Sequence, residues 1–119
     1  MKAKIFEDLS VWQKSHRFVL EVYRLTQGFP NHELFGLVSQ IRRSTVSVPA
    51  NIAEGFKKRG LADKLRYFNI SQGSLEETRY YLILANDLGY ADTNYLRKNL
   101  DEIARMLDGY MKSIKNKQR

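Results

Sequence analysis

Apolar residues recur at intervals of three and four along four successive stretches of the chain, which is the spacing of an amphipathic helix. We expect helices over about residues 9–27, 33–59, 61–88 and 92–115. Glycine lies at the boundaries between these stretches, as at Gly28 and Gly60, where helices commonly end. Four helices joined by short loops predict an all-α fold: an antiparallel up-down-up-down four-helix bundle forming a single domain over residues 1–119, with a short basic C-terminal tail.

Pro49 lies inside the second predicted helix. A proline there removes one backbone hydrogen bond and clashes with the carbonyl four residues earlier, at a cost of about 3 kcal/mol. The apolar seam nevertheless keeps its phase on both sides, because Val48 and Ile52 remain in register. We therefore predict one continuous helix with a kink at Pro49, in which the hydroxyls of Thr45 and Ser47 help to satisfy the loosened carbonyls.

The third predicted helix carries two apolar stripes rather than one. Leu75 and Leu82 belong to the first stripe, and Ile70 and Leu84 belong to the second. Two stripes indicate packing against more than one neighbour, and a small bundle offers few ways to bury both. We therefore expect a subunit interface and a homo-oligomer, although periodicity alone gives no subunit number.

Composition narrows the range of functions. The chain has 119 residues, which is enough for one hydrophobic core but not for two. It has no cysteine, which excludes disulfides and thiolate chemistry. Its longest apolar run, residues 80–85, is far too short to span a bilayer, and residues 1–8 lack the apolar core of a secretory signal. We expect a cytoplasmic protein that contacts no membrane.

The net charge of +7 is concentrated in two places. Residues 42–66 carry seven basic and two acidic side chains, a net of +5, and residues 109–119 carry four basic side chains and no acidic one. Such clustering is typical of a surface that meets a polyanion, although a solvated basic face without a ligand explains it equally well. The basic side chains of residues 109–119 would add unspecific attraction. The candidate phosphate contacts are Arg42, Arg43, Lys57, Lys58, Arg59, Lys64 and Arg66.

A polar stripe runs beside the apolar seam of the second predicted helix. Its members are spaced four and three residues apart and are Gln40, Ser44, Ser47, Asn51 and Glu54. A shorter counterpart on the third helix consists of Asn69, Gln72 and Glu76. Serine, asparagine and glutamine are middling helix formers that an ordinary surface need not prefer. We therefore favour a buried polar network that fixes helix or subunit register over the alternative, a solvated helix face.

Residue types needed for catalysis are scarce and poorly spaced. The two histidines, His16 and His32, lack a glutamate three residues earlier, so the pairs of a di-metal bundle are missing. The glycine spacing of residues 55–60 lacks the lysine and hydroxyl of a phosphate loop. The adjacent carboxylates Glu76 and Glu77 diverge by about 100° on a helix. We expect no enzyme activity, no metal, no cofactor and no small-molecule substrate.

Residues 37–56 carry a specific motif, Gln-x-Arg-Arg followed by Ser-x-Pro-x-Asn-x-x-Glu-Gly. Further matches flank it, at residues 6–9, 73–77 and 88–90. Over essentially its whole length the chain resembles the four-helix bundle proteins encoded in intervening sequences of bacterial 23S ribosomal RNA genes. The same fold family includes the accessory proteins of diversity-generating retroelements.

The resemblance implies an assembly more than an activity: ring-like homopentamers with a positively charged face and no established catalysis. Binding of structured nucleic acid is the usual proposal for such proteins, and the retroelement proteins also bind a reverse transcriptase. We therefore expect a non-enzymatic homo-oligomer, pentameric by resemblance, that binds structured RNA rather than DNA, with ribosomal RNA as the leading candidate. The alternative is a scaffold that docks an acidic protein partner such as a reverse transcriptase.

Overall fold

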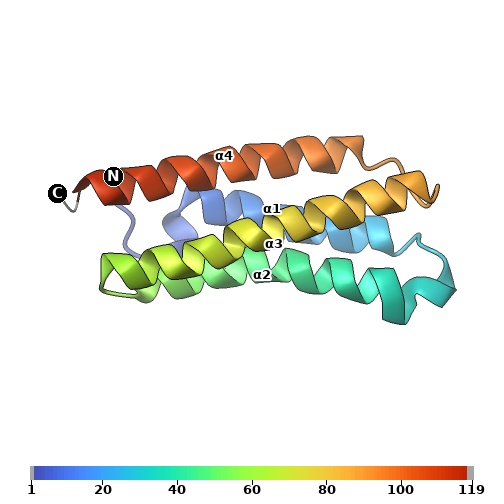
Figure 1. The fold of residues 1–119 in the computed structure, drawn as a ribbon, viewed down its shortest axis with the longest axis horizontal. Coiled ribbons are helices and arrows are strands. Elements are labelled where there is room, and N and C mark those ends of the chain that lie inside the picture. The colour runs from blue at the N-terminus through green and yellow to red at the C-terminus, as the bar shows by residue number, and fades with distance from the viewer. Residues whose placement is uncertain (1, 118–119) are drawn as a thin grey trace.

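The computed structural model describes residues 2–117, in which four long helices follow one another. They are α1 (Ser10–Thr26), α2 (Ser39–Lys57), α3 (Leu61–Asp87) and α4 (Asn94–Lys117). Successive helices run in opposite directions along a rod of 49 × 23 × 20 Å (Figure 1). The turn between α2 and α3 consequently lies at the same end of the rod as the two chain termini (Figure 1). The expectation of an all-α four-helix bundle is confirmed.

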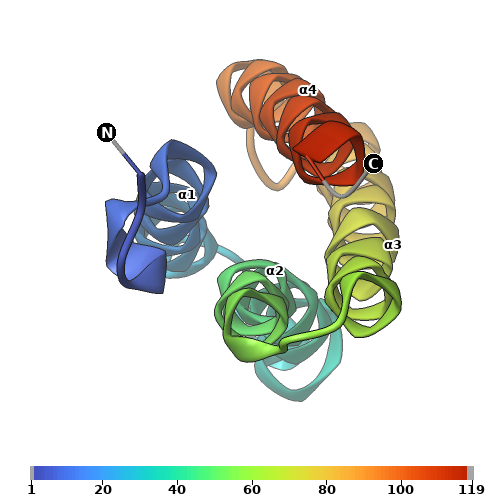
Figure 2. The ribbon, with the colours of Figure 1, turned by 90° about the vertical axis from the view of Figure 1, so that its left-hand side faces the viewer.

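The helices surround a shared apolar core, and each contacts the next in sequence while α4 also contacts α1 (Figure 2). Helix α4 contributes three fully buried side chains to this core, Leu100, Ile103 and Leu107. The two stripes of α3 differ: Leu75 and Leu82 of the first are buried, whereas the second leaves a row of partly exposed side chains. One bundle thus buries one stripe of α3 and part of the other.

The connection between α1 and α2 differs from the prediction. The periodicity predicts a helix from about residue 33, but the regular α-helix begins at Ser39, after a 3-10 turn over Asn31–Glu33 and a π-helical turn over Leu34–Val38. Gly36 interrupts this segment with non-helical φ and ψ angles of −108° and −110°. The interruption turns the apolar residues at the start of this segment outward: Leu34 is 50% exposed and Phe35 is 92% exposed, whereas Leu37 and Val38 are buried.

Pro49 lies inside α2 and does not end it. Side chains donate to the two carbonyls just before it: the Ser71 hydroxyl of α3 donates to the Val48 carbonyl at 2.9 Å, and the Asn51 amide donates to the Ser47 carbonyl at 2.8 Å. These donors differ from the two hydroxyls that the sequence indicates. They hold the backbone close to the proline, although the carbonyl that loses its helical donor is that of Thr45, four residues before Pro49. A kink at this position stays a prediction.

Helix α3 ends at a glycine in the left-handed conformation. Gly89 has a φ of +77°, which glycine adopts without steric cost. The backbone N–H of Tyr90 then donates to the Ala85 carbonyl at 2.9 Å, which closes the helix end. Beyond the turn, the buried Thr93 hydroxyl donates to the Leu82 carbonyl at 2.8 Å. This bond ties the start of α4 to α3.

Candidate nucleic-acid interface

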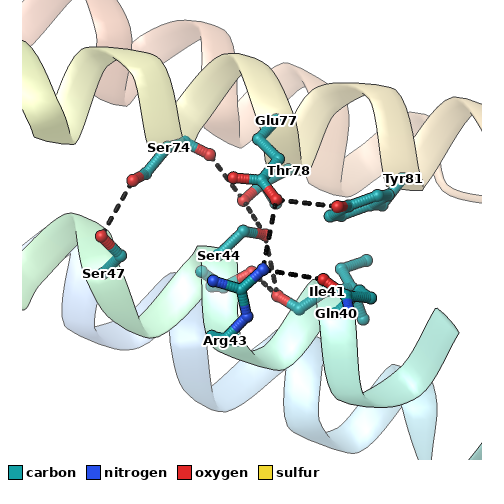
Figure 3. A network of polar contacts seen from close by, with 10 residues as sticks. Gln40, Ile41, Arg43, Ser44, Ser47, Ser74, Glu77, Thr78 and Tyr81 are labelled. Carbon is teal, nitrogen blue, oxygen red and sulfur yellow. Dashed lines mark hydrogen bonds and ion pairs between the residues drawn. The ribbon is translucent and has the colours of Figure 1, made fainter. Parts of the chain in front are cut away.

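Helices α2 and α3 are joined by hydroxyl groups that lie between them (Figure 3). Ser44 and Thr78 share a hydrogen bond of 2.8 Å, and the Ser74 hydroxyl donates to that of Ser47 at 2.9 Å. Thr78 also donates to the Ser74 carbonyl at 2.8 Å. Because hydrogen bonds are directional, this α2–α3 seam fixes how the two helices are aligned. It therefore also fixes the position of the turn that joins them.

At its exposed edge the seam becomes charged (Figure 3). Arg43 donates to the Gln40 amide oxygen at 2.8 Å, and its guanidinium lies 3.8 Å from the Glu77 carboxylate. The Tyr81 hydroxyl donates to the same carboxylate at 2.7 Å, and this bond raises the pKa of Tyr81. Gln40 thus lies at the solvent edge of the seam, whereas Ser44 is buried within it.

One member of the predicted polar network on α2 is wrong. Asn51 joins the network by donating to the Ser47 hydroxyl at 2.9 Å. Glu54 does not, because its exposed carboxylate points along its own helix to Lys58, 3.5 Å away. The stripe leaves the interface after Asn51, where α2 approaches its C-terminal end.

The predicted counterpart on α3 is also wrong. Asn69 is exposed, Gln72 donates to Asp108 of α4 at 2.7 Å, and Glu76 accepts from Arg79 at 2.8 Å. The residues that meet α2 are instead small hydroxyl residues of the two apolar stripes, Ser71, Ser74 and Thr78. Their place among apolar residues is the signal that would have identified them, because a hydroxyl in such a stripe needs a buried partner.

Five of the candidate phosphate contacts surround the turn between α2 and α3, which we call the basic turn: Lys57, Lys58, Arg59, Lys64 and Arg66. Lys57 and Arg59 are exposed, and neither forms a hydrogen bond or an ion pair with another side chain within residues 2–117. Their charges consequently face solvent, with no carboxylate of residues 2–117 at ion-pair distance.

The ring of Tyr67 contacts two further cations of the basic turn. The Lys58 ammonium and the Arg66 guanidinium lie 5.1 and 4.7 Å from the centroid of its ring. Arg66 also lies 3.9 Å from Asp63. Exposed ion pairs of this kind contribute only about 0–1 kcal/mol, so a phosphate can compete for the cation. The sequence places Tyr67 beside Arg66, but only the fold brings Lys58 to the same ring.

The Lys64 ammonium is directed toward the backbone of α2 and not toward solvent. Its ammonium donates to the carbonyls of Phe56 and Gly55, at 2.7 and 3.4 Å, at the C-terminal end of α2. Carbonyls at a helix end lack backbone partners and carry partial negative charge. Burial lowers the pKa of Lys64. Lys64 therefore caps α2 from α3, and less of its charge is available to a ligand than that of Lys57 or Arg59.

The two remaining candidates lie elsewhere. Arg42 donates to the Thr26 hydroxyl at 2.9 Å and to the Tyr23 carbonyl at 3.3 Å, and its guanidinium stacks 4.5 Å from the Tyr23 ring. It thereby satisfies the C-terminal end of α1. Fifteen residues separate it from Lys57 along α2, about 22 Å at the helical rise. The structure does not bring Arg42 or Arg43 to the basic turn.

The basic residues near the C-terminus lie in a helix and not in a tail. Lys112, Lys115 and Lys117 are exposed on α4, and Arg119 lies outside the described residues. No group of His, Asp and Glu side chains that could hold a metal ion occurs in residues 2–117. Over the same described range, none of the helices has the length and apolar character that crossing a membrane requires.

These features define a small, basic four-helix bundle protein. The family model described as 23S rRNA-intervening sequence protein matches residues 7–109. The chain therefore belongs to the family of 23S rRNA-intervening sequence proteins, as the motif around Pro49 indicates.

A solved structure supports the same assignment. The chain is similar to a protein with unknown function from the S23 ribosomal protein family of Bacteroides thetaiotaomicron VPI-5482, whose crystal structure was determined at 1.70 Å. The two share 28% sequence identity with a TM-score of 0.81, and the match covers 89% of this chain and 98% of the other. A comparison with curated proteins finds no match.

Proposed function

We propose that this protein binds structured RNA, foremost ribosomal RNA, through the basic turn and without catalysis. One observation carries the proposal: Lys57 and Arg59 project free charge into solvent at the same turn where Tyr67 holds Lys58 and Arg66. The family name refers to 23S ribosomal RNA, which makes such RNA the first ligand to test.

The proposed contact is with the phosphate backbone. Lysine and arginine neutralise phosphates and release their counterions, which supplies affinity without reading sequence. Double-stranded RNA is recognised mostly by shape and by backbone contacts. Of the two arginines away from the basic turn, Arg43 is the one available to add to such a contact, because 70% of its side chain is exposed. Arg42 is held by α1.

We also propose that the protein assembles into a homo-oligomer, a pentamer by resemblance to its family. The second stripe of α3 supports this, because Ile70 and Leu88 remain 43% and 50% exposed. A ring would repeat the basic turn in every subunit and so multiply its attraction for a long RNA. Light scattering at micromolar concentration is expected to show a multiple of 13.9 kDa, and a monomer of that mass would contradict the assembly.

The RNA proposal is tested by replacing the two free cations, Lys57→Ala with Arg59→Ala. The matched control is Lys112→Ala with Lys115→Ala, two exposed lysines on α4. Binding to an RNA hairpin is measured by fluorescence anisotropy over a range of salt concentrations. Affinity declines as salt is added, so the slope of log affinity against log salt is negative. If both residues contact phosphate, this slope is expected to become shallower by about 1.4 to 1.8 in the first variant. The control is expected to change it much less.

The same assay separates RNA binding from the alternative scaffold function. Poly-glutamate serves as the acidic polypeptide, in competition with the hairpin. Hairpin binding that poly-glutamate displaces poorly supports the RNA proposal. Tight binding of poly-glutamate with weak binding of the hairpin would favour an acidic protein partner instead. Unchanged affinity and salt slope in the folded double variant would show that the basic turn is only a solvated helix end.

A further inference from the structure

A cavity of about 850 Å³ opens at the end of the bundle that carries both termini. It lies between the N-terminal segment, the first turn of α1, the end of α2 and the last turns of α4; Figure 2 views the molecule from this end. Its volume falls within the range of about 300–1,000 Å³ that is typical of small-molecule sites. It does not include the α2–α3 seam, and Lys64 is the residue that it shares with the basic turn.

The inner wall of this cavity is apolar. Leu9, just before α1, and Val11 of α1 line one side, Met106 and Ile114 line it from α4, and Phe56 lines it from the end of α2. All five side chains belong to the main hydrophobic core or pack against it, so the wall is held in place from behind. Such a wall takes the apolar part of a ligand, because burying hydrocarbon against it removes both surfaces from water.

The charged groups of the cavity are mainly cationic. Among the described residues 2–117, Lys2, Lys64 and Lys117 line it against a single carboxylate, Asp8, a net of +2. The Asp8 carboxylate is already engaged, because one of its oxygens accepts from the backbone N–H groups of Lys4 and Ile5 at 3.0 and 3.2 Å. The net charge that a bound molecule meets is therefore positive, with Lys2 and Lys117 supplying the cations that are not held by helix-end carbonyls as Lys64 is.

Tyr110 adds a neutral hydrogen-bond donor to the same cavity. Its ring packs edge-on against Phe68, with 5.5 Å between the ring centroids. Its hydroxyl forms no hydrogen bond to another side chain or backbone group of residues 2–117, and burial raises its pKa, so the hydroxyl keeps its proton at neutral pH. The hydroxyl is therefore available at the wall of the cavity to donate to an acceptor on a ligand in place of water.

We propose that this cavity binds an amphipathic carboxylate, with its alkyl chain against the apolar wall and its head group among the lysines and the Tyr110 hydroxyl. The molecule would be a ligand and not a substrate, since no group in the cavity is placed to react with it. The proposal does not depend on RNA binding, and its test avoids Lys64 for that reason.

The test uses the full chain and two probes of equal chain length, dodecanoate and dodecyltrimethylammonium. Each competes with the fluorescent anion anilinonaphthalene sulfonate, whose emission rises in apolar surroundings. Dodecanoate is expected to displace the dye at least about tenfold more effectively than the cation, because opposite charges attract and like charges repel at the mouth of the cavity. Dodecanoate binding is also expected to weaken as salt is added.

Two pairs of variants locate the site. Ser113→Trp places a bulky ring at the rim of the cavity, while Asn116→Trp places the same ring on exposed α4 outside it. The first is expected to weaken dodecanoate binding by about tenfold or more and the second to leave it unchanged. The double variant Lys2→Gln with Lys117→Gln is also expected to weaken dodecanoate binding. Its control is Lys112→Gln with Lys115→Gln, which is expected to leave binding unchanged because neither lysine lines the cavity. Thermal melting establishes that each variant is folded.

Three results would overturn the proposal. The first is the absence of dodecanoate binding to the wild-type chain. The second is equal displacement by the anionic and cationic probes, which would show that alkyl chains bind without regard to charge. The third is unchanged binding in folded Ser113→Trp and in the Lys2 and Lys117 variant, which would place the probe elsewhere on the molecule.

Discussion

Helix α4 faces the core with hydrocarbon, whereas the seam between α2 and α3 is lined with hydroxyl groups. On α4 the buried residues Leu100, Ile103 and Leu107 exclude water but make contacts without a preferred direction. In the α2–α3 seam, Ser44 meets Thr78 through a hydrogen bond that forms in one alignment only. The comparison indicates that the hydrocarbon of α4 contributes stability without fixing an alignment, while the α2–α3 seam sets the alignment on which the basic turn depends.

The largest expected effect is on the hydrocarbon side. Replacing Leu107 with alanine is expected to lower the free energy of unfolding by about 2–5 kcal/mol, because it removes buried methyl groups and leaves a cavity. Leu107→Met, which conserves volume, is expected to cost less than about 1.5 kcal/mol. Urea denaturation measures both values. A loss of only a few tenths of a kcal/mol for the alanine variant would refute the assignment of stability to α4.

The next effect concerns how closely α2 and α3 approach. A Cβ on Gly55 would lie 2.7 Å from the Phe68 ring, whereas one on Gly73 would meet nothing within 4 Å. Gly55→Ala is therefore expected to destabilise the protein by about 1–2 kcal/mol, after the gain in helix propensity is subtracted. Gly73→Ala is expected to stabilise it by up to about 1 kcal/mol. Equal shifts in the melting temperature of the two variants would mean that the contact at Gly55 is not tight.

A smaller effect distinguishes directional from non-directional packing. Ser44→Ala and Thr78→Val are each expected to cost about 1 kcal/mol, because each breaks the buried hydrogen bond between the two helices while the remaining hydroxyl keeps a carbonyl of its own helix as partner. The double variant is expected to cost less than the sum, with a coupling of at least about 0.5 kcal/mol. The free energies of unfolding of the four proteins give this coupling. Strict additivity would show that the hydroxyl pair behaves like the hydrocarbon of α4.

The smallest effect is in the alkaline pH range. The bond to Glu77, followed by burial, raises the pKa of Tyr81 above its ordinary value of 10.0, and burial raises that of Tyr110. Because the unfolded chain releases these protons at lower pH, both contributions are complete below about pH 10 and are lost as the pH rises through the higher, folded-state values. Tyr81→Phe is expected to flatten part of this decline in stability.

Glu77→Gln separates the two tyrosines. It removes the acceptor charge beside Tyr81 but leaves the surroundings of Tyr110 unchanged, so only the Tyr81 pKa is expected to move toward its ordinary value. Ultraviolet absorbance of tyrosinate, compared between this variant and Glu77→Gln combined with Tyr81→Phe, isolates the Tyr81 titration. A Tyr81 pKa that does not change in Glu77→Gln would contradict the hydrogen bond as the main cause.

The sequence by itself determined the helices and the side of each that faces the core. Periodicity identifies the buried face of α4 and the first stripe of α3, because a residue's angular position on a helix follows from its number. Glycines at helix ends, such as Gly89, are likewise local signals. The motif around Pro49 was enough to indicate the family. These features depend on residues close together in the chain, which is why the sequence alone determines them.

Only the tertiary structure decided which residues meet across the helices. Periodicity does not fix how far one helix slides along another, so Asn69 and Glu76 were paired with the α2 stripe although Ser74 and Thr78 meet it. Apolar spacing likewise does not indicate the interruption at Gly36, before which Leu34 and Phe35 are exposed although the spacing continues through them.

Long cationic side chains are decided by the fold for a further reason. They bind whichever carbonyls or rings lie within reach, so Lys64 became a cap of α2 and Arg42 a cap of α1, while Lys57 and Arg59 stayed free. All four look alike as charges in the sequence. The cavity at the end of the bundle arises in the same way, because residues 2–11, Phe56 and residues 106–117 meet only after the helices have packed.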